Sequence, residues 1–325
     1  MKAITQDRYG PPEVLEYKDI EQPVPGPHEV LVRVRAASVN ARDWHVMRGD
    51  PYVARLMDRS TFGRRAPRNP VRGTDFAGTV EAVGPAVTRL RVGDEVFGES
   101  EGAFAELVCA PEDVVAVRPE ALPVEQAAAL PLAGNTALLG LRHVRPGDRV
   151  LVNGASGGVG TFAVQLAKAA GATVTAVCGP RNTDLVRSLG ADMVIDRTRT
   201  DFTASGERHD TVFDLVGNRS LRALGRAVDP NGTLVLSGGG TSRGGSIIGP
   251  VALIIRGMAA SRFVRHRLVV LNAAPTAANL AELAGLTTAG TITPVIDRTY
   301  PLSDAAAAIR YMETEHARAK LVLTV

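Results

Sequence analysis

The stretch that decides the fold is "VLVNGASGGVGTFAVQLAKAAGATVTAVC", which runs from Val150 to Cys178. An apolar run at its start meets a cluster of glycines. A helical pattern then covers Val159 to Ala170, and a β-branched run covers Thr173 to Val177. This order predicts a strand, a tight turn, a helix and a second strand, which together form the βαβ unit of a parallel sheet.

The turn inside this unit matches the G-x-G-x-x-G fingerprint, with alanine in the first place. In that fingerprint one glycine lets the backbone approach a pyrophosphate, and another lets the helix pack closely on its strand, while N–H groups at the helix N-terminus bind the anion. The strand before the turn and the helix after it are the context that the motif requires. The alternative is a glycine-rich turn in another α/β protein. We predict cofactor binding by Ala155, Ser156, Gly157, Gly158, Val159 and Gly160.

The end of the second strand indicates which dinucleotide binds. An NAD site places Asp or Glu there for the adenosine ribose, whereas a 2′-phosphate requires an arginine and no acid. After Cys178 the chain reads Gly-Pro-Arg181-Asn182, and the first carboxylate is Asp184, which we expect to cap the next helix. We therefore predict NADP(H), with Cys178, Arg181 and Asn182 at the site. The alternative is that Arg181 is only a solvated surface arginine.

Composition limits the function classes. A chain of 325 residues has room for two domains, and a formal net charge of +3 gives no reason to expect a nucleic-acid partner. Two cysteines, Cys109 and Cys178, cannot build a disulfide framework, so we expect a reducing, cytoplasmic location. The longest apolar run, Ile247 to Ile255, is too short for a stable membrane span.

The chain changes character at about residue 122. Before it, Val30 to Val39, Gly78 to Val83 and Phe104 to Val108 read as strands between Gly and Pro turns. After it, helices and buried strands alternate, beginning with a helix at Val124 to Val144 and including a strand at Met193 to Asp196. This alternation predicts a parallel doubly wound sheet. Parallel sheets bind ligands at the carboxyl ends of their strands. On that ground we predict further cofactor contacts from Leu215, Val216, Ser237, Gly238 and Gly239.

Several local phrases then occur in order along the chain: "AASVNARD" (36–43), "GTDFAGTVEAVG" (73–84), "VGDEVFG" (92–98), "NTA" (135–137) and "ARAKLVL" (317–323). Together with the fingerprint they resemble medium-chain dehydrogenases/reductases of the zinc-independent quinone oxidoreductase type. The resemblance implies an α/β fold with a Rossmann domain at 122–275 and a GroES-like β-barrel catalytic domain at 1–121, completed by a return segment at 276–325. It also implies an active site in the cleft between the domains, and a homodimer joined through the strand near Leu268 to Asn272.

The resemblance locates the positions where zinc-bearing relatives hold their catalytic metal. Those positions are Asn40, Thr74 and Leu132 here. A catalytic zinc needs three protein ligands from Cys, His or carboxylate side chains, and none of these residues qualifies. We therefore predict no metal. Arg42 also replaces the hydroxyl that such relatives often use as a proton relay.

Without a metal, the chemistry that fits best is hydride transfer to an acceptor that spreads the developing charge. We predict an NADPH-dependent reductase of quinones or of activated C=C bonds (enone or enoyl). The resemblance implies that Asn40 orients the nicotinamide or the substrate oxygen, that Thr136 contacts the nicotinamide end, and that Lys320 lies at the cofactor, with Ala319 replacing the family's usual glycine. Tyr52 is the candidate proton donor, against a packing role. A metal-free NADP-dependent alcohol dehydrogenase and a non-catalytic NADP-binding redox sensor remain alternatives.

Two segments are rich in arginine. One holds Arg55, Arg59, Arg64, Arg65, Arg68 and Arg72, and the other holds Arg256, Arg262, Arg265 and Arg267. They are consistent with a small-molecule substrate that has an anionic tail, with an acidic membrane surface, or with loops that only face solvent.

Overall fold

The computed structural model describes residues 1–237, 245, 257, 264–315 and 318–325. It contains two compact units. The first comprises Met1–Asn135 and Ala274–Val325, and the second comprises the described residues of 136–240 and 248–273. The predicted contacts Gly238 and Gly239, the apolar run 247–255, and the arginines Arg256 and Arg262 lie outside the described residues.

In the part of the chain that the structure describes, the second unit is built on a six-stranded sheet in which every neighbouring pair is parallel. The sheet order is β10-β9-β8-β11-β12-β13. The strands are β8 (Arg149–Asn153), β9 (Thr173–Cys178), β10 (Met193–Asp196), β11 (His209–Asp214), β12 (Val228–Leu236) and β13 (Arg267–Val270). Buried, nearly continuous apolar runs such as β8 and β9 are typical of parallel strands covered on both faces.

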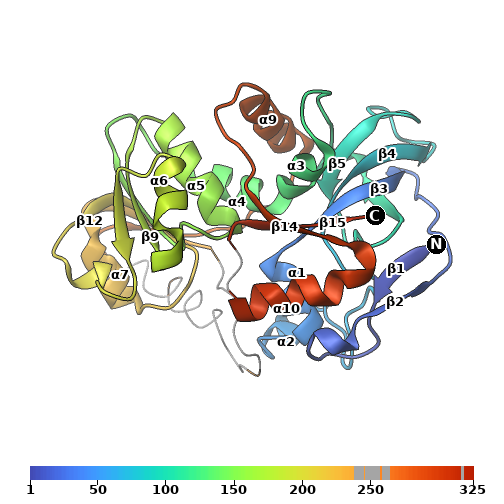
Figure 1. The fold of residues 1–325 in the computed structure, drawn as a ribbon, viewed down its shortest axis with the longest axis horizontal. Coiled ribbons are helices and arrows are strands. Elements are labelled where there is room, and N and C mark those ends of the chain that lie inside the picture. Colours follow the sequence, from blue (N-terminus) through green and yellow to red (C-terminus); the bar gives the residue numbers. More distant parts are fainter. Residues whose placement is uncertain (238–244, 246–256, 258–263, 316–317) are drawn as a thin grey trace. The chain divides into compact units, whose positions relative to one another are not determined.

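The helices of this unit follow the strands. Among the described residues they include α5 (Gly158–Ala169), α6 (Thr183–Ser188) and α7 (Leu221–Ala227), and Figure 1 shows α5 and α6 beside β9. The short 3₁₀ turns η3 (Pro180–Asn182) and η4 (Phe202–Ala204) lie in the connections. Leu151, Val177, Phe202, Val212, Leu224 and Leu234 form the core. The predicted α/β fold with a doubly wound parallel sheet is confirmed.

The described residues of the first unit contain a mixed sheet of seven strands. Its order is β14-β15-β3-β4-β5-β7, with β6 also paired to β3. Among the described strands of this sheet, only β14 and β15 pair in parallel. The strands are β3 (Glu29–Val39), β4 (Asp75–Val83), β5 (Glu95–Glu99), β6 (Leu107–Pro111), β7 (Val115–Val117), β14 (Ile296–Pro301) and β15 (Lys320–Thr324). Because β15 pairs with β3, the C-terminal segment completes the GroES-like sheet that the N-terminal segment begins.

Smaller elements surround this sheet. The strands β1 (Lys2–Thr5) and β2 (Glu16–Asp19) form a separate two-stranded antiparallel sheet, and β1 also makes isolated bridges to Ala105 and Val71. The helices described here are α1 (Ala41–Arg48), α2 (Ala54–Met57), α3 (Val124–Ala129), α9 (Ala277–Thr288) and α10 (Ala305–Glu315). The helix α4 (Pro131–Leu141) begins in this unit and continues into the second one, which starts at Thr136. The 3₁₀ turns are η1 (Pro12–Val14), η2 (Glu112–Val114) and η5 (Leu302–Asp304).

Two element predictions differ from the structure. The strand expected at Phe104 to Val108 begins only at Leu107, because Phe104 instead exchanges backbone hydrogen bonds with Ile4 and Arg72. The single helix expected from Val124 to Val144 is divided into α3 and α4 at Pro131, which has no N–H group to continue the first helix.

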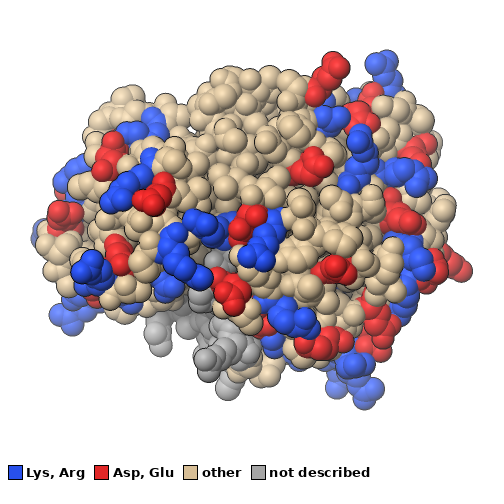
Figure 2. Space-filling view, in the orientation of Figure 1, with Lys and Arg blue, Asp and Glu red and all other residues tan. Residues whose placement is uncertain are grey.

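Lysine, arginine, aspartate and glutamate side chains are interspersed on the face drawn in Figure 2. None of the helices in the described part of the chain combines the length and apolar character that a membrane crossing needs.

The packing of α5 on β8 predicts a steric effect. A Cβ on Gly160 would come within 2.2 Å of the Gly154 carbonyl oxygen and 2.6 Å of the Ala155 carbonyl carbon, and both are backbone atoms. We expect Gly160→Ala to lower the free energy of unfolding by about 2 kcal/mol, measured by urea denaturation. Gly157→Ala is the control, since the nearest atom to its Cβ would be 3.4 Å away. Equal losses in the two variants would contradict this packing account.

Candidate active site

The glycine-rich turn lies at the carboxyl end of β8. Gly157 is the N-cap of α5, and the space around a Cβ at this residue is open except for one contact at 3.4 Å. The tight turn itself falls on Gly154, whose φ of +90° favours glycine. Sequence reasoning had given the first place of the motif to Ala155, which is buried and donates its N–H to the Val177 carbonyl. Gly154 therefore does the work expected of the first glycine.

The end of β9 combines two arginines with a polar contact to the turn. Asn182 donates its amide to the Ser156 hydroxyl at 3.0 Å, so two predicted cofactor residues meet. Arg181 is exposed on η3. The guanidinium of Arg197, which sequence reasoning missed, lies within 3.9 Å of the position that a Cβ on Gly179 would take. The sequence feature that could have identified Arg197 is its position directly after β10, the strand beside β9.

One acid also lies nearby. Asp196 on β10 is the register partner of Cys178 on β9, although the two are 18 residues apart in sequence. Its carboxylate accepts hydrogen bonds from the Thr198 backbone and hydroxyl, at 2.9 and 2.8 Å. Burial, followed by the Asp196 charge, raises the pKa of the Cys178 thiol. The thiol is therefore neutral and serves as a small buried group.

The ends of β8, β11 and β12 are joined by a buried aspartate that the sequence did not single out. Asp214 accepts hydrogen bonds from the Asn153 amide at 2.7 Å and from the backbone of Val216 at 3.2 Å. Its own carbonyl accepts from the Ser237 backbone at 3.1 Å. Burial raises the pKa of Asp214. The predicted contacts Leu215, Val216 and Ser237 are thus collected at the edge of the sheet that carries the glycine turn.

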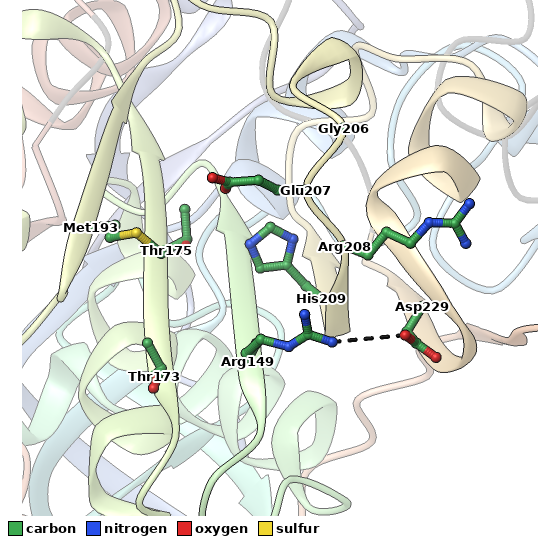
Figure 3. Close-up of a pocket in the computed structure, with 9 residues that line it drawn as sticks. All are labelled: Arg149, Thr173, Thr175, Met193, Gly206, Glu207, Arg208, His209 and Asp229. Carbon is green, nitrogen blue, oxygen red and sulfur yellow. Dashed lines mark ion pairs between the residues drawn. The ribbon is translucent and has the colours of Figure 1, made fainter.

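A separate pocket of about 470 Å³ opens at the opposite edge of this sheet (Figure 3). Its lining includes the first residues of four strands, Arg149, Thr173, Met193 and His209. Ligands of parallel sheets bind at the carboxyl ends of strands, and this pocket lies at the amino ends. It is therefore not the cofactor site.

In the first unit, the start of α1 gathers two of the three positions considered for a metal. The Asp43 carboxylate accepts from the Asn40 backbone at 2.8 Å and from the Thr74 hydroxyl at 2.7 Å. All three residues are buried. Burial raises the pKa of Asp43 to about 6, although both hydrogen bonds oppose the shift. Asp43 therefore has a structural role, since its carboxylate caps α1 and holds the Thr74 hydroxyl.

The third position joins the same cluster through a second aspartate. Asp75, which is fully buried, accepts from the Leu132 backbone at 3.2 Å and from the Ser38 hydroxyl at 3.0 Å. The Lys320 ammonium lies 3.4 Å from Asp75 and donates to the Asn40 side-chain oxygen at 2.5 Å. Lys320 is only 2% exposed. Two predicted site residues, Asn40 and Lys320, are therefore in direct contact, and Asp75 is the missed partner of Lys320.

Glu99 adds a further carboxyl group to this cluster. It is the register partner of Asp75 across β4 and β5. Burial, together with the negative charge of Asp75, raises the pKa of Glu99 to about 8. One of its oxygens is buried without a hydrogen-bond partner in the described part of the chain. At neutral pH the side chain is therefore mainly protonated.

The remaining predicted residues lie in different surroundings. Tyr52 is 45% exposed, and its ring stacks on the Arg55 guanidinium at 4.7 Å. Thr136 is buried on α4, next to Asn135, whose side chain hydrogen-bonds Asn279 and the Ala274 carbonyl. Arg42 forms a half-exposed ion pair with Glu101.

Among the residues that the structure describes, no three His, Cys, Asp or Glu side chains group so that they could hold a metal ion.

The raised pKa of Glu99 predicts a pH dependence of stability. The unfolded chain releases this proton near the ordinary value of 4.5, whereas the folded protein retains it up to about 8, so stability falls as pH rises through this interval. Asp43 contributes in the same direction, but only up to about pH 6. Between about pH 6.5 and 8 we expect the wild type to lose roughly 2 kcal/mol.

Glu99→Gln should flatten this loss, because the amide does not titrate, and urea unfolding at several pH values measures it. The matched control is Glu101→Gln, which removes a carboxyl group from the exposed ion pair with Arg42. A wild-type profile that is flat over this range, or equal slopes in wild type and Glu99→Gln, would contradict the assignment.

The chain is similar to known proteins over its whole length. Residues 26–120 match the family model of the alcohol dehydrogenase GroES-like domain, and residues 189–323 match that of the zinc-binding dehydrogenase. The chain is 34% identical to the chloroplast envelope quinone oxidoreductase homolog of Arabidopsis thaliana, with 99% of this chain and 98% of that protein covered.

Solved structures show the same likeness. The quinone oxidoreductase from Coxiella burnetii superposes with a TM-score of 0.87 at 32% identity, covering 100% of this chain and 99% of that one. The Escherichia coli quinone oxidoreductase complexed with NADPH superposes with a TM-score of 0.85 at 26% identity, covering both chains fully. With its glycine turn, parallel sheet and GroES-like unit, this chain belongs to the quinone oxidoreductase-like branch of the medium-chain dehydrogenase/reductase superfamily.

Proposed function

We propose that the protein is an NADPH-dependent reductase that transfers hydride to a quinone or to an activated C=C bond. The observation that carries the proposal is the contact between the buried Lys320 ammonium and the Asn40 side-chain oxygen, at 2.5 Å. This contact fixes the amide of Asn40 in one orientation, because the oxygen must face the cation. An oriented amide of this kind can position a substrate carbonyl or the carboxamide of a nicotinamide.

The residues of the second unit fit a dinucleotide. The open space at Gly157 and the N-terminus of α5 suit a pyrophosphate, and Arg181 and Arg197 offer charge for a 2′-phosphate. When bound, NADPH supplies the hydride. The chain's own residues bind and orient it: Ser156 and Asn182 at the turn, and Leu215, Val216 and Ser237 at the neighbouring strand ends.

The choice of acceptor rests on charge. The cluster around Asn40 places one ammonium beside the carboxyl groups of Asp75 and Glu99. A conjugated acceptor spreads the incoming charge over several atoms, so hydrogen bonds of moderate strength can stabilise it. A quinone or enone therefore suits this site better than an isolated ketone. Tyr52 remains the proposed proton donor.

The proposed preference for NADPH can be tested at the two arginines. We expect Arg181→Gln and Arg197→Gln each to raise the KM for NADPH roughly tenfold, since each removes a charged hydrogen bond to the 2′-phosphate, and to leave the KM for NADH unchanged. Arg187→Gln is the control, because this exposed arginine of α6 pairs with Asp184. Tighter binding of NADH than of NADPH by the wild type, in a fluorescence titration, would overturn the preference.

The proposed chemistry can be tested by NADPH oxidation with a quinone, an enone and an enoyl thioester. We expect turnover on at least one of them and a loss of roughly tenfold or more in kcat for Asn40→Ala, with the Kd for NADPH nearly unchanged. Ser38→Ala is the control, because it removes another buried hydrogen bond of the cluster, that from Ser38 to Asp75. It separates the loss of the Asn40 amide from general damage to the cluster. Tyr52→Phe tests the phenol in the same assay. NADPH binding without turnover on all three substrates would favour the redox sensor instead.

Two further features belong to this proposal. We propose a homodimer in which β13, the edge strand of the described sheet, pairs with its copy. We also propose a reducing cytoplasmic location, in keeping with two cysteines that are both free.

A further inference from the structure

The loop between α1 and β4 presents apolar side chains to solvent. Leu56 and Met57, the last two residues of α2, are 71% and 65% exposed, and Tyr52 precedes them at 45%. Single exposed apolar residues are ordinary, but an adjacent pair of large ones at the end of a helix forms a patch. Leaving such a patch in water is unfavourable unless something covers it.

Specific contacts hold this loop in its conformation. The Arg55 side chain donates to the Gly49 carbonyl at 2.8 Å and stacks on the rings of Tyr9 at 4.0 Å and Tyr52 at 4.7 Å. Further along, Phe62 and Pro67 are buried and form a β-bridge. Because Arg55 and Phe62 provide the anchors, the side chains of Leu56 and Met57 are left on the outside.

The arginines of this loop fall into two groups. Arg55 is used in stacking and Arg72 is buried, whereas Arg59, Arg64, Arg65 and Arg68 are exposed. Within the residues described by the structure, none of the four exposed arginines forms an ion pair. The single acid of residues 52–72, Asp58, accepts hydrogen bonds from Ser60 and Thr61 of its own loop. The loop therefore carries four uncompensated positive charges beside its apolar pair.

We infer that this loop, residues 52–68, docks on the surface of an anionic lipid bilayer. Guanidinium groups bind phosphate and carboxylate oxygens bidentately, and these are the groups that anionic headgroups present. Leu56 and Met57 then enter the apolar layer directly beneath the headgroups. A bilayer offers both environments within a few ångströms, whereas an acidic protein surface matches only the charge. The mode of binding is peripheral, through one loop.

The inference is tested by flotation of the full-length protein with phosphatidylcholine vesicles, with and without about one third phosphatidylserine. We expect binding only to the anionic vesicles, weakened at high salt. Arg64→Glu/Arg65→Glu should reduce the partition coefficient at least roughly tenfold. Leu56→Ser/Met57→Ser, which leaves the charge unchanged, should also weaken binding. The binding that remains in this variant should be abolished by high salt.

The matched control is Arg199→Glu/Arg208→Glu, which makes the same change in net charge at two exposed arginines of the second unit. It should bind like the wild type. NADPH binding and circular dichroism verify that each variant is folded, and flotation does not depend on turnover, so failure of the proposed reductase activity would leave this test intact.

Three results would overturn the inference: equal binding to neutral vesicles, equal loss in the Arg199/Arg208 control, or unchanged binding by Leu56→Ser/Met57→Ser. Binding to polyglutamate but not to vesicles would identify an acidic protein as the partner instead. Self-association that is lost in Leu56→Ser/Met57→Ser, seen by sedimentation velocity, would identify a second copy of this chain.

Discussion

The buried ion pair of Lys320 and Asp75 is the constraint on which the first unit depends. Removing an ammonium and a carboxylate from water costs several kcal/mol for each ion, so neither charge can be left alone. Here the Asp75 carboxylate accepts from Ser38, Leu132 and Lys320, and the Lys320 ammonium also donates to Asn40. These partners come from β3, β4, α4 and β15, so the last strand of the chain must lie against the first part of the sheet.

The same pair controls the charge of its neighbours. One ammonium cannot balance three carboxyl groups in a buried site, and the directions of the pKa shifts express this. Asp75 remains beside the cation, while burial raises the pKa of Asp43 to about 6 and that of Glu99 to about 8. At neutral pH Glu99 is therefore mainly protonated and Asp43 is mainly ionised, so the ammonium faces the carboxylates of Asp75 and Asp43. Most polar groups of the cluster are paired with one another, and the Asn40 amide donates to the Ser38 carbonyl at 3.5 Å. A site of this kind orients a reactant more than it activates one.

In the second unit, two glycines of the turn have different structural roles. Gly160 must lack a side chain because the backbone of Gly154 and Ala155 occupies its place, whereas Gly157 lacks one although there is room. Gly160 therefore serves the packing of the helix. Gly157 leaves space that a ligand can use, which agrees with the binding of a pyrophosphate at the N-terminus of α5. The exposed loop of 52–68 lies in the other unit and carries its charge independently of this site.

The sequence by itself determined the elements whose signal is local. The βαβ unit, the alternation after residue 122 and the family motifs all depend on neighbours in the chain, and β10 is found where it was expected, at Met193–Asp196. Fold class and family could be predicted for this reason. The pairing of β1, β5 and β7, in contrast, is set by partner strands elsewhere in the chain, which supply their hydrogen bonds.

Only the tertiary structure decided which polar residues meet. Asp75 and Lys320 are 245 residues apart, and Asn40 and Lys320 are 280 residues apart, yet each pair is in contact. Sequence reasoning named Asn40 and Lys320 separately from motifs, but Asp75, Glu99 and Asp214 had no local signal, since a single acid in a strand is most often solvated. Their burial and shifted pKa values arise from desolvation and from the charges brought beside them, and both are properties of the folded chain.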